Sequence, residues 1–436
     1  MQVSKAHYTY IIIGNGIAGT TAARELRKRT QASILIISDE TPYFYSRTAL
    51  MYVFMGHLRF EDTQPYENSF WADHKIDLLQ DRVTALIPEK NRLELNSGKH
   101  FQYETLILAT GSKPRMLPQL DPKASGIQGF YHKKDLEQML HWASSTQKAV
   151  VVGGGLIGVE LAEMLHSRNI EVHFLIREAY FGGTLLPPEE GEMVTEHLRQ
   201  HGIHLHLNDG LDSVALNDSG RVQKVNTKKG ATLPCDWLGV AIGVTPNIDW
   251  LPNKLLNTKK GFLVNDYLQT NLQNIYAIGD CAEIITPAPG RRAIEAVWYS
   301  GRKMGETLAK TLSGQPTVYN PGFWFNSAKF FDLEFQTYGQ VSPQPNPTLE
   351  QHLFWQHPHK NCAIRLAFEP TTTLFLGVLS LGIRLRHRVF DQWFQEKRTL
   401  PYVLDHLAKA GFDSEFSPSY FNQMNFKTQW HVLQNI

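Results

Sequence analysis

The chain has 436 residues, a formal net charge of +1 and 42% hydrophobic residues, which is too long for one hydrophobic core and predicts two or three domains. The near-neutral charge gives no overall field that would recruit nucleic acid or an anionic membrane, so we expect neither as a partner. The longest apolar stretch, 374–383, is too short to span a bilayer, and no charged-then-apolar leader opens the chain. We therefore expect no membrane span.

Cysteine is rare and widely spaced. The three cysteines, Cys235, Cys281 and Cys362, form no Cys-x-x-Cys pair, so they predict neither a metal cluster nor a disulfide framework. This usage is typical of a reducing compartment, and we expect a cytoplasmic protein. Oligomeric state is left open.

The N-terminal region carries a glycine fingerprint. Residues 10–13 form an apolar run, as expected for a parallel strand that is buried on both faces. The glycines that follow it are Gly14, Gly16 and Gly19. They predict a tight turn, close approach of a pyrophosphate to the backbone, and close packing of a helix on the strand. A second apolar run, 33–38, ends at Asp39 and Glu40, about 20 residues past the last glycine, where an acid binds ribose hydroxyls.

The segments after this fingerprint continue an α/β pattern. The aromatic loop 41–50 contains Arg47, whose planar fork suits a phosphate, whereas its aromatic residues are expected to pack in the core. Short alternating strands are predicted within 76–95, and a buried strand within 105–111 ends at Thr110 and Gly111. Prolines within 113–122 indicate a linker.

The glycine fingerprint then occurs a second time. Residues 149–152 predict a strand, a helix follows to about Ser167, and 171–176 predict another strand. The glycines of this second turn are Gly153, Gly155 and Gly158. Arg177 stands after that strand and favours the 2′-phosphate of NADPH. A register shift of one residue would place Glu178 there instead and favour NADH, so both alternatives stay open.

The remaining elements return the chain to the first domain. Three predicted elements complete the second domain: a helix at 189–201, a hairpin turn at 217–220 and a strand at 237–242. Residues 275–278 then predict a strand that meets Gly279 and Asp280 at the start of another helix, with helical pattern over 292–312. The Asp280 carboxylate could accept hydrogen bonds from a polyol such as ribityl.

These motifs, in this order over residues 8–312, resemble the FAD- and NAD(P)-dependent pyridine nucleotide oxidoreductases. The resemblance implies an α/β fold with two Rossmann-like dinucleotide-binding domains, the second inserted in the first, and a smaller α+β C-terminal domain. The implied domains are an FAD-binding domain in two parts, 1–116 and 246–317, an NAD(P)-binding domain, 117–245, and a C-terminal domain, 318–436.

One branch of this family is favoured by residues 46–52, which contain no cysteine where disulfide branches place theirs. Tyr45, Arg47 and Leu50 match the Tyr-x-Arg-Pro-Pro-Leu-Ser-Lys motif of ferredoxin reductases, rubredoxin reductases and apoptosis-inducing factor, while Tyr52 replaces its lysine.

The likeness weakens toward the C-terminus. Residues 321–327 resemble the Pro-x-Phe-Trp-Ser-Asp opening of the C-terminal domain in this branch, and 374–380 and 389–397 read as a strand and a helix. The tail after Gly411 matches no pattern.

The resemblance assigns the sites residue by residue. The implied FAD contacts are Gly14, Gly16, Gly19, Asp39, Glu40, Arg47, Thr110, Gly111, Gly279 and Asp280, with Val83 as a backbone contact. The implied NAD(P)H contacts are Gly153, Gly155, Gly158 and Glu160, with Arg177 added on the argument above. Glu160 would lie near the nicotinamide amide, or would only complement the helix dipole. Trp298 and Trp324 would shield the flavin or simply pack in a core.

The expected function is hydride transfer from NAD(P)H to FAD, with electrons then leaving to a small acidic iron-sulfur protein. Reduction of a quinone or dioxygen, or a slowly reacting redox-sensing role, are the alternatives.

Because the flavin performs the chemistry, no catalytic nucleophile or general base is expected, and no metal site. The basic run 384–388 would dock an acidic partner, or would be a solvated turn or an internal pair with Asp391. His352, His357 and His359 are expected at the surface.

Overall fold

A computed structural model describes residues 5–251, 255–413, 415–416 and 418–434. The chain divides into two compact units, one formed by residues within 1–116, 129–144 and 243–321, and the other by residues within 117–128, 145–242 and 322–436. Each unit contains a parallel sheet with a glycine turn, so the predicted α/β fold with two Rossmann-like parts is confirmed. The domain boundaries given above stay predictions.

The first unit is built on a sheet whose strand order is β3-β2-β1-β6-β5-β4, with β18 beside β6. Its strands are β1 (His7–Ile13), β2 (Ile34–Ser38), β3 (Ile76–Gln80), β4 (Val83–Ile87), β5 (Arg92–Leu95), β6 (His100–Leu108) and β18 (Ile275–Ala277). Strands β1, β2, β3, β6 and β18 pair in parallel. Residues Ile11 and Ile12 are fully buried, which explains the continuous apolar run of β1.

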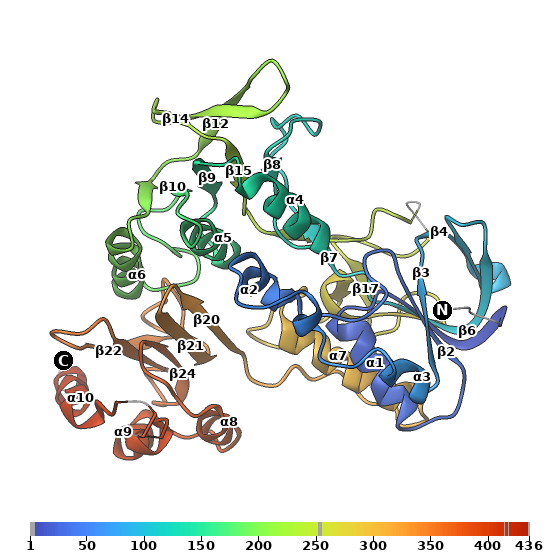
Figure 1. Cartoon of the computed structure of the whole chain (residues 1–436). Helices are drawn as coiled ribbons and strands as arrows, with labels where there is room; N and C mark the ends of the chain where they lie inside the picture. Colours follow the sequence, from blue (N-terminus) through green and yellow to red (C-terminus); the bar gives the residue numbers. More distant parts are fainter. Residues whose placement is uncertain (1–4, 252–254, 414, 417, 435–436) are drawn as a thin grey trace. The chain divides into compact units, whose positions relative to one another are not determined.

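Two long helices pack together beside this sheet (Figure 1). These are α1 (Ile17–Arg27) and α7 (Trp298–Leu312). Gly305 of α7 permits the contact, because a Cβ there would lie 2.7 Å from the carbonyl oxygen of Ala18. The smaller elements of the unit are α2 (Leu50–Phe54), α3 (Phe70–Asp73), α4 (Lys133–Ala143), β7 (Ser112–Pro114), β16 (Val244–Pro246), β17 (Phe262–Val264) and β19 (Ala282–Ile284).

The helix expected directly after Gly279 and Asp280 is absent, and this prediction is wrong. A single 3-10 turn, Gly279–Cys281, leads instead into β19. Strand β19 pairs in parallel with β17, so these residues continue as extended chain. Helix α7 begins only at Trp298, after two prolines in 287–289 that cannot continue a helix.

The second unit contains the other parallel sheet, with strand order β11-β10-β9-β15-β8. Its strands are β8 (Ile127–Gln128), β9 (Lys148–Val152), β10 (Glu171–Ile176), β11 (His204–Leu207) and β15 (Trp237–Val240), and its helices are α5 (Leu156–His166) and α6 (Pro188–Gln200). The predicted hairpin at 217–220 is confirmed, because it joins the antiparallel strands β12 (Leu211–Leu216) and β13 (Val222–Thr227), which β14 (Thr232–Pro234) extends.

An antiparallel sheet with order β20-β21-β24-β23-β22 completes the second unit. Its strands are β20 (Phe325–Phe330), β21 (Leu333–Gly339), β22 (Gln351–Gln356), β23 (Ala363–Phe368) and β24 (Phe375–Leu381). Helices α8 (His387–Gln395), α9 (Leu400–His406) and α10 (Phe426–Gln434) share one hydrophobic core with this sheet (Figure 1). The strand expected at 374–380 and the helix expected at 389–397 are confirmed, whereas α10 has no counterpart in the sequence analysis.

A buried ion-pair cluster joins this antiparallel sheet to α6. On β23, Arg365 donates from Nε to Glu190 Oε1 at 2.8 Å and from Nη2 to Glu189 Oε2 at 2.7 Å. The Glu190 side chain is 0% exposed and that of Arg365 is 6% exposed. His352, expected at the surface, also lies here with its side chain 7% exposed and bonded to Glu350, so that prediction is wrong: β22 carries it into the sheet interior.

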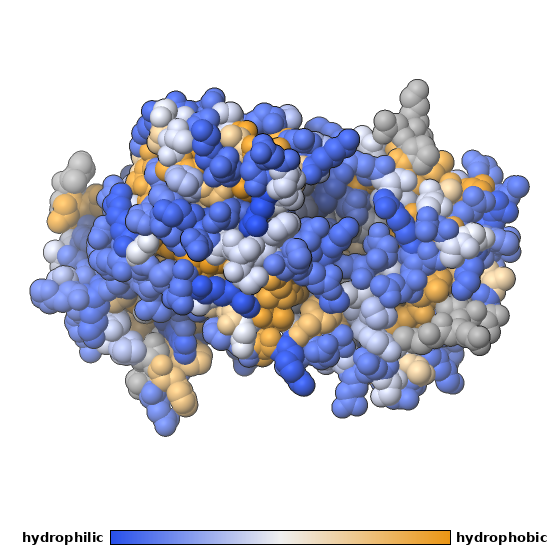
Figure 2. Space-filling model, turned by 45° about the horizontal axis from the view of Figure 1, so that its top comes forward, coloured by the Kyte–Doolittle hydropathy of each residue, from blue (hydrophilic) through white to orange (hydrophobic). Residues whose placement is uncertain are grey.

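Figure 2 shows a face dominated by hydrophilic side chains and interrupted by small hydrophobic areas. Within the described ranges, no helix has both the length and the apolar character needed to cross a bilayer.

Candidate functional site

The first glycine turn joins β1 to α1 and leaves no room for side chains at two positions. Gly14 has φ +108°, and a Cβ there would lie 2.1 Å from the carbonyl oxygen of Ala109. A Cβ on Gly19 would lie 2.1 Å from the carbonyl oxygen of Gly14. Gly16, in contrast, has nothing within 4 Å of its Cβ position. Two glycines are therefore required by packing, and the third leaves open space above the backbone.

The second glycine turn, between β9 and α5, repeats this geometry. Gly153 has φ +116°, and its Cβ would lie 2.4 Å from the carbonyl oxygen of Ala241, while a Cβ on Gly158 would lie 2.1 Å from the carbonyl oxygen of Gly153. Gly155 again has nothing within 4 Å. The same three roles thus recur in the same order in both units.

Both turns lead into helix N-termini that suit an anion. Helices α1 and α5 begin at the N-caps Gly16 and Gly155, without a side-chain cap and without an acidic residue in the first turn. The first N–H groups of such a helix have no intrahelical acceptor and add to its positive dipole end. The pyrophosphate of a dinucleotide fits each turn, because the N–H groups of the first helical turn can donate to it and the glycine leaves open space above the backbone.

A hydrogen-bonded network links three predicted FAD contacts of the first unit. Arg47 pairs with Glu40, with Nη2 2.7 Å from Oε2, and donates from Nη1 to the carbonyl oxygen of Tyr131 at 2.5 Å. The Tyr131 hydroxyl in turn donates to Asp280 Oδ2 at 3.0 Å. Burial raises the pKa of Asp280, and the hydrogen bond that the Tyr131 hydroxyl donates opposes this rise by stabilising the carboxylate. The structure brings Glu40, Arg47 and Asp280 into one cluster.

Sequence reasoning missed Tyr131, which stands in the loop before α4, 149 residues from Asp280. No local pattern marks it. Its ring also stacks under the Arg47 guanidinium, whose carbon lies 4.5 Å from the ring centroid.

The two acids at the end of β2 have different surroundings. Although burial opposes ionisation, the His132 and Arg47 side chains hold the pKa of Glu40 well below its ordinary value. Glu40 also accepts from the Tyr45 hydroxyl and from the Lys133 N–H. Asp39 is exposed and has no side-chain hydrogen bond among the described residues. This arrangement favours Asp39 as the acid available to a ribose; both contacts stay predictions.

The remaining predicted FAD residues lie in the first unit. Thr110 donates from Oγ1 to the carbonyl oxygen of Asn247 at 2.7 Å, which fixes the turn after β6. Gly111 and Gly279 have positive φ, +67° and +74°, and both therefore need glycine. Val83 opens β4 with its side chain buried.

Arg177 lies directly after β10 with its side chain 84% exposed, and its Nη2 is 3.0 Å from Glu178 Oε1. Arg177 and Glu178 both lie at the end of β10, so either could meet the ribose: Arg177 would favour NADPH and Glu178 would favour NADH. The cofactor preference stays a prediction.

Glu160 lies on α5, two residues after Gly158. Burial, together with the charge of Glu163, raises the pKa of Glu160 to about 7. Glu160 is the fifth residue of α5 and lies beyond the first turn of the helix, and the helix dipole acts most strongly within that first turn. The contact of Glu160 with the nicotinamide amide and its interaction with the helix dipole both stay predictions.

The thiols and tryptophans complete the predicted set. Cys281 is fully buried with its Sγ 3.3 Å from the carbonyl oxygen of Ile278, and burial raises its pKa, so it is an inert packing residue. The Trp298 ring packs on Phe44 at 5.9 Å between centroids. Trp298 is partly buried against the core of the first unit, and shielding of the flavin by Trp298 or Trp324 stays a prediction.

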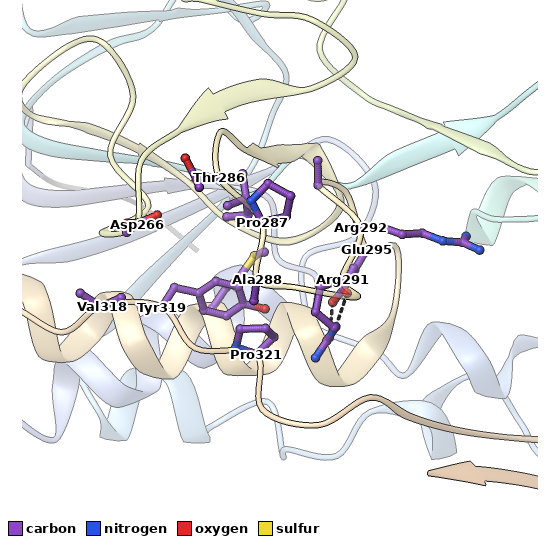
Figure 3. A pocket seen from close by; sticks show the side chains of 13 residues that line it. Asp266, Thr286, Pro287, Ala288, Arg291, Arg292, Glu295, Val318, Tyr319 and Pro321 are labelled. Carbon is purple, nitrogen blue, oxygen red and sulfur yellow. Dashed lines mark hydrogen bonds and ion pairs between the residues drawn. The ribbon is translucent and has the colours of Figure 1, made fainter. Parts of the chain in front are cut away.

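A pocket of about 180 Å³ also lies in the first unit, between the 284–295 segment and 318–321 (Figure 3). In its wall, Arg291 pairs with Glu295, with Nε 2.6 Å from Oε1. None of the predicted contact residues lines this pocket, so it is separate from the glycine turns.

Comparison with known proteins agrees with this geometry. The family model described as pyridine nucleotide-disulphide oxidoreductase matches residues 8–302. The 5,5'-dehydrodivanillate O-demethylase ferredoxin reductase subunit of Sphingobium sp. is 30% identical over 340 residues, covering 76% of this chain and 82% of that protein. The rubredoxin-NAD(+) reductase of Acinetobacter baylyi is 31% identical over 316 residues, covering 70% and 79%.

A solved structure shows the same fold. The ferredoxin reductase from Rhodopseudomonas palustris superposes with a TM-score of 0.78 at 24% identity, covering 86% of this chain and 91% of that chain. The family match over residues 8–302, more than half of the chain, confirms the predicted family resemblance.

Proposed function

Because this chain belongs to the pyridine nucleotide-disulphide oxidoreductase family, we propose that it passes electrons from NAD(P)H through FAD to a small, acidic iron-sulfur protein. As a member of this family it is an oxidoreductase that uses FAD and NAD(P)H. The observation that carries the proposal is the pair of equivalent glycine turns, one in each unit. One turn would hold each dinucleotide.

The chain's own residues bind and orient rather than react. Bound FAD supplies the chemistry, since it accepts a hydride and releases electrons singly or in pairs. Gly16 and Gly155 leave backbone space for the two pyrophosphates. Asp39 would accept from a ribose hydroxyl, and Asp280 would accept from the polyol chain. Glu160 would hydrogen-bond to the carboxamide of the nicotinamide and so orient the hydride donor.

The exit of electrons does not use a thiol near Arg47. Residues 46–52 contain no cysteine, and Cys235, Cys281 and Cys362 are free and buried. Direct transfer to an external acceptor is therefore the expected route. The relatives named above act, by their names, on ferredoxin and rubredoxin, which supports an iron-sulfur acceptor. The free thiols also support a cytoplasmic location, where they stay reduced.

Two of the three arginines in the basic run 384–388 support an acidic partner. Arg384 pairs with Glu334, with Nε 2.6 Å from Oε2, and Asp391 accepts from Gln395 instead, so the predicted alternative of an Asp391 pair is wrong. Arg386 and Arg388 are exposed and form no ion pair within the described part of the chain. These two cations are the ones available to steer an acidic protein.

The test uses purified holoprotein in two steps. Anaerobic addition of NADPH or NADH should bleach the flavin absorption; unchanged absorption with both would reject the oxidoreductase proposal. Reduction of an acidic ferredoxin by the variant Arg386→Glu/Arg388→Glu should then fall at least about tenfold at low salt, while reduction of a small neutral dye is retained. The matched control Lys259→Glu/Lys260→Glu changes net charge equally at another exposed site and should retain both rates. Equal losses in both double variants would show that Arg386 and Arg388 do not dock the acceptor.

A further inference from the structure

Three metal-ligand side chains converge at the C-terminal end of α6. His197 lies on the last turn of α6, His201 is the residue that ends it, and Asp332 lies in the turn between β20 and β21. Their ligand atoms all lie within 4.8 Å of one another. Asp332 Oδ1 is 2.8 Å from His197 Nε2 and 3.2 Å from His201 Nε2. All three residues belong to the second unit.

The helix explains why the two rings point the same way. Residues four apart lie on one face of a helix, one above the other. The two imidazole centroids are 4.4 Å apart at an angle of 65°, so both Nε2 atoms can face a common point. Asp332 approaches that point from the tight turn β20–β21.

The hydrogen bond of the His201 ring leaves the lone pair of its Nε2 available. His201 Nδ1 is 2.9 Å from the carbonyl oxygen of His197, which can only accept, so Nδ1 carries the proton and Nε2 carries the lone pair. His197 Nδ1 is 3.0 Å from the Asn361 side-chain amide. The atom of that amide nearest to His197 Nδ1 is Asn361 Nδ2, and the other orientation of the amide, with its oxygen toward Nδ1, is the one that a metal ion on Nε2 would require. Metal-binding histidines are commonly oriented by such second hydrogen bonds.

An independent observation points to a ligand. His197 is only 8% exposed, and its buried Nε2 has no hydrogen-bond partner of acceptable geometry among the described residues, although Asp332 Oδ1 is close. A buried polar atom without a partner is unfavourable. A cation held between Nε2 and the carboxylate would satisfy it.

We propose that His197, His201 and Asp332 bind a divalent transition-metal ion, with Zn²⁺ the best match. Two imidazoles and one carboxylate are ligands that Zn²⁺ accepts, and water would complete a tetrahedral site. Metal-ligand bonds of about 2.0–2.1 Å place tetrahedral ligand atoms about 3.3 Å apart. The observed separations of 2.8 and 3.2 Å need only a small outward movement of Asp332, whose side chain is 78% exposed.

The ion would fasten α6 to the β20–β21 turn, and this role does not depend on the proposed redox function. Arg365 holds the N-terminal end of α6 through Glu190, and the metal would hold its other end. Metal bound to the folded protein adds stability, because the unfolded chain does not keep the three ligands together.

The test measures Zn²⁺ and Co²⁺ binding to full-length protein without a polyhistidine tag, after chelator treatment and dialysis. Titration calorimetry should detect one equivalent of Zn²⁺, and Co²⁺ should give visible absorption bands of a low-coordinate site. Saturating Zn²⁺ should raise Tm by about 3 °C or more. Asp332→Asn, at an exposed position, should weaken binding at least about tenfold, because one of three protein ligands is lost.

Two further variants make the result decisive. His201→Asn should also lose the bound equivalent of Zn²⁺ and the Tm rise, which would test a second ligand independently of Asp332. His204→Asn is the matched control, because His204 is an exposed histidine on β11 that stacks on His173 in the same unit. It should keep full binding. The proposal would be overturned if wild type bound no more Zn²⁺ than Asp332→Asn does. It would also be overturned if His204→Asn lost Zn²⁺ binding while Asp332→Asn and His201→Asn kept it.

Discussion

Replacing Glu160 with glutamine is expected to stabilise the protein above neutral pH and to leave its stability unchanged in mild acid. The pKa of Glu160 is raised to about 7, by burial first and then by the charge of Glu163. Glu163 forms an ion pair with Lys329 on β20, and its Oε1 is 3.2 Å from Lys329 Nζ. The folded chain therefore holds the Glu160 proton more tightly than the unfolded chain does.

The size of the effect follows from that pKa. A rise from the ordinary 4.5 to about 7 corresponds to about 3 kcal/mol, at ~1.4 kcal/mol for each tenfold change in proton affinity. Because the folded state binds the extra proton, the free energy of unfolding is largest below pH ~4.5, falls as the pH rises to about 7, and then levels off. A neutral glutamine avoids this loss, so Glu160→Gln should gain up to about 3 kcal/mol at pH 8 and little at pH 4.5.

The assay is denaturant unfolding of the apoprotein at pH 4.5 and pH 8, with wild type, Glu160→Gln and the control Glu196→Gln. Glu196 is an exposed carboxylate on α6, 58% accessible, and its replacement should change stability by no more than about 0.5 kcal/mol at either pH. A gain that is equal at both pH values, or a loss at pH 8, would show that burial does not strain the Glu160 carboxylate.

Three further substitutions test the binding turns. Gly14→Ala should destabilise the fold by more than about 2 kcal/mol and abolish FAD retention, because its Cβ would meet a backbone carbonyl at positive φ; thermal unfolding and flavin content report both. Arg47→Met should cost about 2–3 kcal/mol in urea unfolding at pH 7 by removing the partner of Glu40. Since the Glu40 pKa is lowered, this deficit should shrink as the pH falls below ~4.5. Arg177→Glu should shift the ratio of kcat/KM values from NADPH toward NADH, and an unchanged ratio would assign the contact to Glu178.

Local patterns were sufficient for the two strand-turn-helix units. Gly14 and Gly153 could be predicted because a strand, a turn without space for Cβ and an amphipathic helix are consecutive in the chain. Thr110 and Gly111 could be placed for the same reason. The helix expected after Asp280 could not, because a distant strand, β17, pairs with those residues and keeps them extended.

Contacts between distant segments lay outside the reach of pattern analysis. Tyr131 joins Arg47 to Asp280 only once three separate segments have packed. The choice between Asp39 and Glu40 likewise depends on that packing. His197 and His201 show a helical spacing of four in the sequence, but their third partner, Asp332, is 131 positions away from His201 and carries no local signal.

The buried pair of Arg365 and Glu190 limits how this protein can be recombined with its relatives. A chimera that retains α6 but receives β20–β24 from another family member inherits Glu190 with its side chain 0% exposed. Without a cation at the position of Arg365, that carboxylate must be protonated or left uncompensated, at a cost of roughly 3–5 kcal/mol. A chimera that keeps the glycine turn between β9 and α5 intact is therefore not functional on that account alone. The antiparallel sheet, which carries Arg365, and helix α6, which carries Glu190, have to be exchanged together.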